Sequence, residues 1–174
     1  MKLRAEAFAS AEAFLNYDTE GRPGCIVTDL RLMGISGLEL QEQSAQQHSS
    51  LPVIVLTAFA RTSITVQAIQ AGAVTVLDKP YKEDDLWEAI RAALAKDAIE
   101  RERVQAKQAI RSKFEQLTPI EKKVLDLILD GQPNKAIAKA LKISMRTVAN
   151  RRAGIMAKTG AASIAELIRL VIAG

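Results

Sequence analysis

The chain has 174 residues, of which 48% are hydrophobic and 25% charged, an ordinary composition for one large or two small globular domains. This composition argues against wholesale disorder. With no bilayer-length apolar run and no visible secretory signal, we expect a cytoplasmic protein without a membrane partner. One cysteine excludes an internal disulfide and one histidine argues against zinc, so no metal site is expected on these grounds.

Positive charge is concentrated in the C-terminal third of the chain. Residues 113–174 hold 11 Lys and Arg against 5 Asp and Glu, whereas residues 1–82 and 83–112 each have a net charge of −1. A small basic domain beside a near-neutral one is typical of a protein that meets an anionic polymer. A solvated basic surface explains the charge equally well, so charge alone leaves nucleic-acid binding open.

The N-terminal half alternates short apolar runs with helical patterns. The runs at residues 25–28, 53–57 and 74–77 are continuous rather than alternating, as in strands that are covered on both faces. Helical patterns at residues 37–47 and 62–71 lie between them. This alternation predicts a parallel α/β sheet with helical crossovers.

One further unit precedes this alternation, and one long helix follows it. Residues 3–8 are predicted to form a strand and residues 11–17 a helix that Ser10 caps. From Glu83 to Gln116 the chain has no Gly or Pro and interleaves charges with an apolar stripe, which predicts a long helix rather than a disordered linker. We assign three segments: a first domain at 1–95, a helical linker at 96–113 and a second domain at 114–174.

Capping signals predict four short helices in the second domain. Capping boxes at residues 118–121 and 163–166 open the first helix and the last, and Asn134 and Ser144 are candidate caps of the two between them. The middle helices, 135–141 and 145–158, have helix-turn-helix spacing.

The outer face of helix 145–158 carries Arg146, Asn150, Arg151 and Arg152. A helix fits the major groove of DNA, where Asn can read adenine and Arg can read guanine or hold phosphate. Because any small helical bundle offers such a helix pair, the spacing alone is weak evidence.

A longer pattern in the second domain resembles the LuxR-type DNA-binding domain. It consists of LTPIEKKVL at 117–125, GQPNKAIA at 131–138, LKISMRTV at 141–148 and IMAKTG at 155–160. The resemblance implies that the third helix enters the major groove of double-stranded DNA. The positions it places at DNA are Thr147, Ala149, Asn150, Arg151, Ala153 and Lys158. Ala149 and Arg151 depart from the usual Lys and His, and Arg151 and Arg152 are expected to supply other phosphate contacts.

Three side chains stand at the ends of neighbouring predicted strands. Asp29 and Thr57 end the first two runs and Lys79 follows the third, so a parallel sheet brings them to one edge. An acid that accepts a phosphoryl group, an amine that pairs with its charge and a hydroxyl that binds an oxygen form a plausible phosphoryl-transfer site.

The surrounding residues resemble the receiver domain of two-component response regulators in the FixJ/NarL grouping. The matching stretches are IVTDLR at 26–31, SGLEL at 36–40, PVIVLTA at 52–58, AGAV at 71–74 and DKP at 78–80. The resemblance implies a flavodoxin-like fold, Asp29 as phospho-acceptor, Thr57 and Lys79 as switch and charge partners, and a cis peptide at Lys79-Pro80.

The chain departs from this receiver pattern before Asp29. The first strand, the first helix and the acidic pair that binds Mg²⁺ find no counterpart, Met33 replaces a Pro, and Val76 takes the place of an aromatic residue. Because phosphoryl transfer needs a divalent cation, we expect weak Mg²⁺ binding. Mg²⁺ is expected as a cofactor only if the receiver is functional.

These observations predict a DNA-binding transcriptional regulator, not an enzyme, that acts as a homodimer with weak or no phosphorylation control. One alternative is a conventional phospho-switch at Asp29, driven by a histidine kinase. Another is a protein-interaction module that does not bind DNA.

Overall fold

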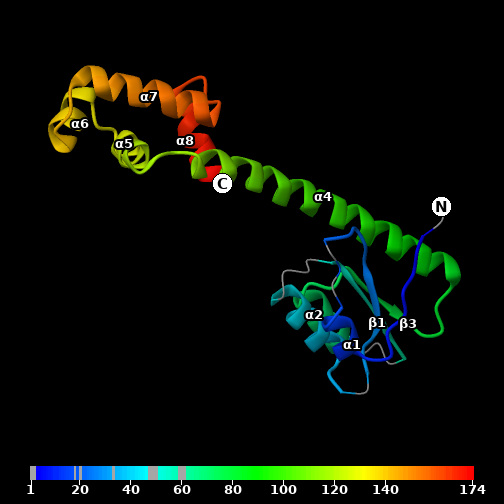
Figure 1. Ribbon diagram of the computed structural model, residues 1–174. Helices are drawn as coiled ribbons and strands as arrows, with labels where there is room; N and C mark the ends of the chain where they lie inside the picture. Colours follow the sequence, from blue (N-terminus) through cyan, green and yellow to red (C-terminus); the bar gives the residue numbers. More distant parts are fainter. Residues whose placement is uncertain (1–2, 18, 20, 33, 47–50, 59–61) are drawn as a thin grey trace. The chain divides into compact units, whose positions relative to one another are not determined.

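A computed structural model of the chain describes residues 3–17, 19, 21–32, 34–46, 51–58 and 62–174 (Figure 1). The chain divides into two compact units between Arg101 and Glu102, a boundary inside the predicted linker at 96–113. The expectation for Met33 lies outside the described residues.

The first unit contains a three-stranded parallel sheet. Its strands are β1 (Ile26–Asp29), β2 (Val53–Thr57) and β3 (Thr75–Asp78), in the order β1-β2-β3. The predicted strand positions are confirmed to within one residue. Strand β2 is buried along its whole length because it is paired on both sides, whereas β1 pairs only with β2.

Helices cover both faces of this sheet. Val53 and Val55 of β2 pack in a cluster with residues of α1 (Ala11–Leu15), α2 (Gly37–Gln46) and α3 (Thr62–Gln70). The alternate residues of β2, Ile54 and Leu56, pack against Ala89 and Ala93 of α4. Because side chains of a strand point alternately to opposite faces, β2 forms the centre of a helix–sheet–helix sandwich. The receiver-like α/β fold expected from the sequence is thereby confirmed.

The predicted strand at residues 3–8 is wrong, since this segment has no strand structure. Within the described part of the chain, no backbone hydrogen bond joins residues 3–9 to the sheet. A strand is stabilised by its ladder to a neighbour, and these residues have none. The helix after them is shorter than predicted, at Ala11–Leu15, but Ser10 caps it as expected by accepting from the Ala13 N–H at 3.2 Å.

Helix α4 (Glu83–Glu115) confirms the long helix (Figure 1). Asp97, which is only 1% exposed, fastens α4 to the loop before β1: it accepts from the Gly24 N–H at 3.0 Å and from Arg101 Nε at 2.7 Å. Arg101 also donates to the carbonyls of Gly21 and Arg22. This network fixes where β1 starts relative to the helix that covers it.

The second unit is a small helical domain. Its helices after α4 are α5 (Pro119–Leu129), α6 (Asn134–Leu141), α7 (Met145–Thr159) and α8 (Ile164–Ala173). Five side chains at its centre are fully buried: Val124, Ile137, Val148, Ile155 and Leu167. Since each helix after α4 contributes at least one of them, the four helices enclose a single core. The all-α second domain predicted from the capping signals is confirmed.

One predicted cap in this unit is wrong. Pro133 stands at the N-cap of α6, and no side chain caps that helix, because the Asn134 Oδ1 accepts a hydrogen bond from Arg152 instead. The turn to α7 is made by Lys142, whose left-handed φ of 53° ends α6. Ser144 then caps α7 as predicted, accepting from the Thr147 N–H at 3.0 Å.

Candidate nucleic-acid interface and receiver site

Helix α7 presents a basic and largely acid-free surface. It contains four basic residues and no acidic one, so its charge suits a polyanion. Val148, Ile155 and Thr159 on its inner face are completely buried and hold it against α5 and α6. Of the predicted DNA-contact residues, Ala149, Asn150 and Ala153 are exposed, whereas Thr147, Arg151, Arg152 and Lys158 are half-buried. The exposed side of α7 therefore combines small residues with the amide of Asn150 and the guanidinium of Arg146, which is also exposed.

The N-terminal turn of α7 is tightly ordered. The Ser144 hydroxyl lies 2.8 Å from the Thr147 hydroxyl as well as accepting from the Thr147 N–H. Helix N-termini and hydroxyl groups bind phosphate oxygens readily. The capping pair thus fixes Thr147 at the end of the helix where a DNA backbone contact is expected.

Arg152 links the two helices of the helix-turn-helix pair. Its Nη1 donates to the Asn134 Oδ1 at 2.9 Å, so the guanidinium is half-buried between α7 and the start of α6. A side chain held in this way sets the relative position of α6 and α7. This hydrogen bond is a positioning contact, which the place of Arg152 in a basic run did not indicate.

Lys158 is likewise held inside the domain. Its Nζ lies 2.6 Å from the Glu121 Oε2 and 3.3 Å from the Gln116 carbonyl oxygen. Glu121 is only 4% exposed, and its carboxylate also accepts from the N–H and the hydroxyl of Thr118. The bond from Lys158, together with that from the Thr118 N–H, lowers the pKa of Glu121 from its ordinary value of 4.5 to about 2.

Gly154 allows α7 to approach this carboxylate. A Cβ at position 154 would lie 3.1 Å from the Glu121 Oε1, tighter than an ordinary van der Waals contact. The capping box at 118–121 predicted that Glu121 folds back on Thr118, and the structure confirms this. Its pairing with Lys158 is a tertiary contact over 37 residues, and no local sequence signal could have indicated it.

At the edge of the sheet, the structure brings the three predicted receiver residues together. Asp29 and Thr57 end β1 and β2, and both line a pocket of about 130 Å³ with Lys79. The Lys79 Nζ lies 2.5 Å from the Asp29 Oδ1. That oxygen is shielded from solvent and accepts no hydrogen bond of good geometry, so the pairing is electrostatic in character. The Lys79-Pro80 peptide is cis, as the receiver resemblance implied.

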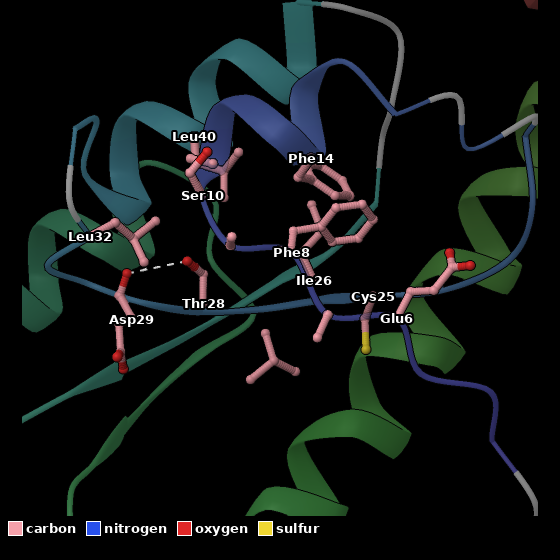
Figure 2. A pocket seen from close by; sticks show the side chains of 14 residues that line it. Glu6, Phe8, Ser10, Phe14, Cys25, Ile26, Thr28, Asp29, Leu32 and Leu40 are labelled. Atoms are coloured by element: carbon pink, nitrogen blue, oxygen red, sulfur yellow. Dashed lines mark hydrogen bonds between the residues drawn. The ribbon is translucent and has the colours of Figure 1, made fainter.

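The donor atoms at this pocket do not fit a Mg²⁺ site. Mg²⁺ requires near-octahedral oxygen coordination and is usually held by carboxylates. Asp29, at the end of β1 in Figure 2, is the only carboxylate among the described residues that line the pocket, and one of its oxygens is paired with Lys79. Over the ranges that the structure describes, no three acidic, His or Cys side chains cluster so as to hold a metal ion.

Comparison with known proteins assigns each of the two units to a protein family. Residues 1–91 match "Response regulator receiver domain" and residues 115–171 match "Bacterial regulatory proteins, luxR family". The chain is 35% identical to the transcriptional regulatory protein TdiR of Thauera aromatica, over 100% of this chain and 77% of TdiR. It is 38% identical to the transcriptional regulatory protein FixJ of Rhizobium meliloti (strain 1021), over 95% of this chain and 81% of FixJ.

A solved structure agrees with these sequence matches. The response regulator StyR superposes with a TM-score of 0.77 at 37% identity, covering 94% of this chain and 83% of StyR. Fold and sites thus define a DNA-binding regulator with a receiver domain and a LuxR-type output domain. The chain belongs to the NarL/FixJ family of response regulators and is a DNA-binding transcriptional regulator. In the part of the chain that is described, no helix is long and apolar enough to cross a membrane.

Proposed function

We propose that this regulator binds a two-fold DNA site as a homodimer in the bacterial cytoplasm, with one α7 helix in the major groove of each half-site. The basic, acid-free α7 and the exposed Asn150 support the DNA contact. An exposed apolar residue on α8, Ile172, of which 80% is accessible, supports pairing of two copies through the output domain. The proposed activity is one of binding, without a catalytic function.

We further propose that DNA affinity depends weakly or not at all on phosphorylation of Asp29. The observation that carries this proposal is that Asp29 is the only carboxylate among the described residues that line the pocket. Phosphoryl transfer to a carboxylate requires neutralisation of the charge between donor and acceptor. Among the described residues that line the pocket, the cations are Lys79 and Arg31, and neither side chain replaces a divalent metal ion held between donor and acceptor.

A conventional phospho-switch is the second candidate, and the same pocket favours it. Asp29, Thr57 and Lys79 are arranged as a phospho-acceptor, a hydroxyl and a cation would be, and a histidine kinase would be the phosphoryl donor. In this case phosphorylation shifts a pre-existing equilibrium between two forms of the protein.

A DNA-binding experiment separates these candidates. The full chain first selects a duplex from a random-sequence pool, and its affinity for that duplex is measured with and without acetyl phosphate and Mg²⁺. The proposal expects two chains per duplex and affinities that agree within about twofold. Tightening by tenfold or more, accompanied by one phosphoryl group per chain, would establish the phospho-switch instead.

A further inference from the structure

We propose that the exposed face of α7 recognises A·T base pairs through the methyl groups of thymine, and that Ala149 and Ala153 are the residues that contact those methyl groups. This inference rests on the proposed function, in which α7 lies in the major groove, and it adds the chemistry by which the helix selects a sequence. The observations that carry it are the spacing, the exposure and the residue types of four side chains on α7.

Four exposed side chains of α7 share one face. Their spacing is i, i+3, i+4 and i+7, and side chains three or four residues apart are neighbours on a helix surface. They are Arg146, Ala149, Asn150 and Ala153. The opposite side of the helix is packed into the core by Val148 and Ile155, which are completely buried. The four residues therefore form the part of α7 that can enter a groove.

The basic residues of α7 stand mainly beside this face. Arg152 bonds to the Asn134 Oδ1, Lys158 pairs with Glu121, and Arg151 is half-buried like both of them. Of the four basic residues in α7, all of which the structure describes, Arg146 alone is exposed, at the N-terminal end of the face. Because phosphates flank the groove and base edges lie between them, the uncharged middle of the face is left to contact bases.

The polar group in the middle of the face suits adenine. Within the described part of the chain the amide of Asn150 makes no hydrogen bond, so it is available to a base. An amide can donate to N7 and accept from the N6 amino group of adenine at the same time, and the thymine paired with adenine presents its C5-methyl group in the same groove. A bond from Asn150 to adenine therefore brings a thymine methyl group close to the neighbouring side chains.

The two alanines that border Asn150 suit that methyl group. A methyl side chain has no polar group that loses water on contact, and alanine is a typical partner of the thymine methyl group. Ala149 and Ala153 lie four residues apart, so their Cβ atoms are about 6 Å from each other, whereas stacked base pairs are about 3.4 Å apart. The two alanines are thus placed to contact different base pairs.

Readout of G·C pairs has less support on this face. Guanine presents only acceptors in the major groove and is bound by Arg or Lys, which the face offers only as Arg146. Cytosine presents a donor, which suits the carboxylates that α7 lacks. We therefore expect the half-site selected by the chain to contain A·T pairs.

The test removes single methyl groups from the DNA. The full chain is titrated with its selected duplex, in which each thymine in turn is replaced by deoxyuridine, a base that differs only in lacking the C5-methyl group. We expect at least one thymine per half-site at which the Kd rises about fourfold, the effect of one buried methyl-sized group. The ratio of the two Kd values should be the same at about 50 and 200 mM salt, because no phosphate contact changes.

Variants of α7 connect each sensitive thymine to a residue. Ala149→Gly and Ala153→Gly each remove one methyl group from the protein, and in the variant that lacks the matching methyl group deoxyuridine should change the Kd less than 1.5-fold. The ratio is measured within each variant, so a general weakening of binding cancels. Ala157→Gly, at an exposed site one turn further along α7, has the same cost in helix propensity and should keep the full deoxyuridine effect.

Three results would overturn the inference while DNA binding itself stays intact. One is a selected half-site without A·T pairs, and another is a half-site in which no deoxyuridine changes the Kd more than 1.5-fold. The third is a deoxyuridine effect that persists in both Ala149→Gly and Ala153→Gly, because another residue would then contact the methyl group. A chain that selects no duplex would overturn the proposed function as well.

Discussion

The Lys158 ammonium lies 2.6 Å from the Glu121 carboxylate and so joins the last turn of α7 to the first turn of α5. Helix α7, which we propose contacts DNA, is therefore held against the core by a charge pair of which one member is almost completely buried. This arrangement separates residues that hold α7 in place from residues that can contact DNA.

Removing the ammonium should destabilise the output domain. In Lys158→Met the Glu121 carboxylate stays buried without its cation, and we expect a loss of about 2 kcal/mol. The loss is smaller than for a fully buried pair because the Lys158 side chain is 35% exposed. Urea-dependent hydrogen exchange of peptides from residues 119–159 measures it. Lys122→Met, at an exposed site on α5, is the matched control and should lie within about 0.5 kcal/mol of the unaltered chain.

The same carboxylate predicts how stability depends on pH. The pKa of Glu121 is about 2 in the folded domain and 4.5 ordinarily, so the unfolded chain binds its proton first as pH falls. The stabilisation from this group is complete above pH 4.5 and is lost as pH falls from there through about 2. Urea midpoints of the domain at pH 7, 4 and 3 should show this loss, and Glu121→Gln should have a lower midpoint at pH 7 but a flatter profile. A profile as steep in Glu121→Gln as in the unaltered chain would contradict the assignment.

Arg151 and Arg152 should differ in their effect on DNA binding. If Arg152 acts by positioning α6 against α7, Arg152→Ala and Asn134→Ala should weaken binding to a similar extent without changing its salt dependence. Within the described part of the chain Arg151 makes no hydrogen bond or ion pair, so Arg151→Ala removes only a cation and should reduce the slope of log K against log salt by about 0.9. Equilibrium titrations of each variant with DNA, at about 50 to 200 mM salt, measure this slope. A reduced slope for Arg152→Ala with none for Asn134→Ala would assign Arg152 to phosphate instead.

The Asp97 network should stabilise the receiver unit independently of the output domain. Asp97→Asn removes a buried charge that accepts from Gly24 and Arg101, and we expect about 3 kcal/mol of destabilisation. Glu88→Gln, exposed on the same helix, is the control. Hydrogen exchange of residues 21–29 should rise in Asp97→Asn, while that of residues 119–159 stays unchanged. Equal loss in both segments would show that the network does not act locally.

Local signals predicted much of this architecture. The continuous apolar runs located β1, β2 and β3, and the box at Thr118 and Glu121 located the start of α5, because both depend on residues adjacent in sequence. Residues 3–8 misled the strand prediction because pairing depends on a neighbour that a local pattern does not contain. The prediction that Asn134 caps α6 fails for a similar reason. Its side chain bonds to Arg152, which is 18 residues away in the sequence, and this bond competes with capping.

For the candidate sites, too, local signals could be predicted from the sequence and tertiary contacts could not. Asp29, Thr57 and Lys79 could be predicted to meet because parallel strands bring their ends to one edge. The close pairing of Lys79 with Asp29 depends on tertiary packing, which periodicity does not describe.

The most direct test of the account is the affinity of the full chain for its selected DNA duplex, compared with that of Asp29→Asn, with and without acetyl phosphate and Mg²⁺. Because Asp29 is the only carboxylate that the described residues contribute to the pocket, and Mg²⁺ is usually held by several oxygen ligands, we predict four Kd values that agree within about twofold. A Kd that falls tenfold or more with phospho-donor in the unaltered chain, but not in Asp29→Asn, would contradict the account.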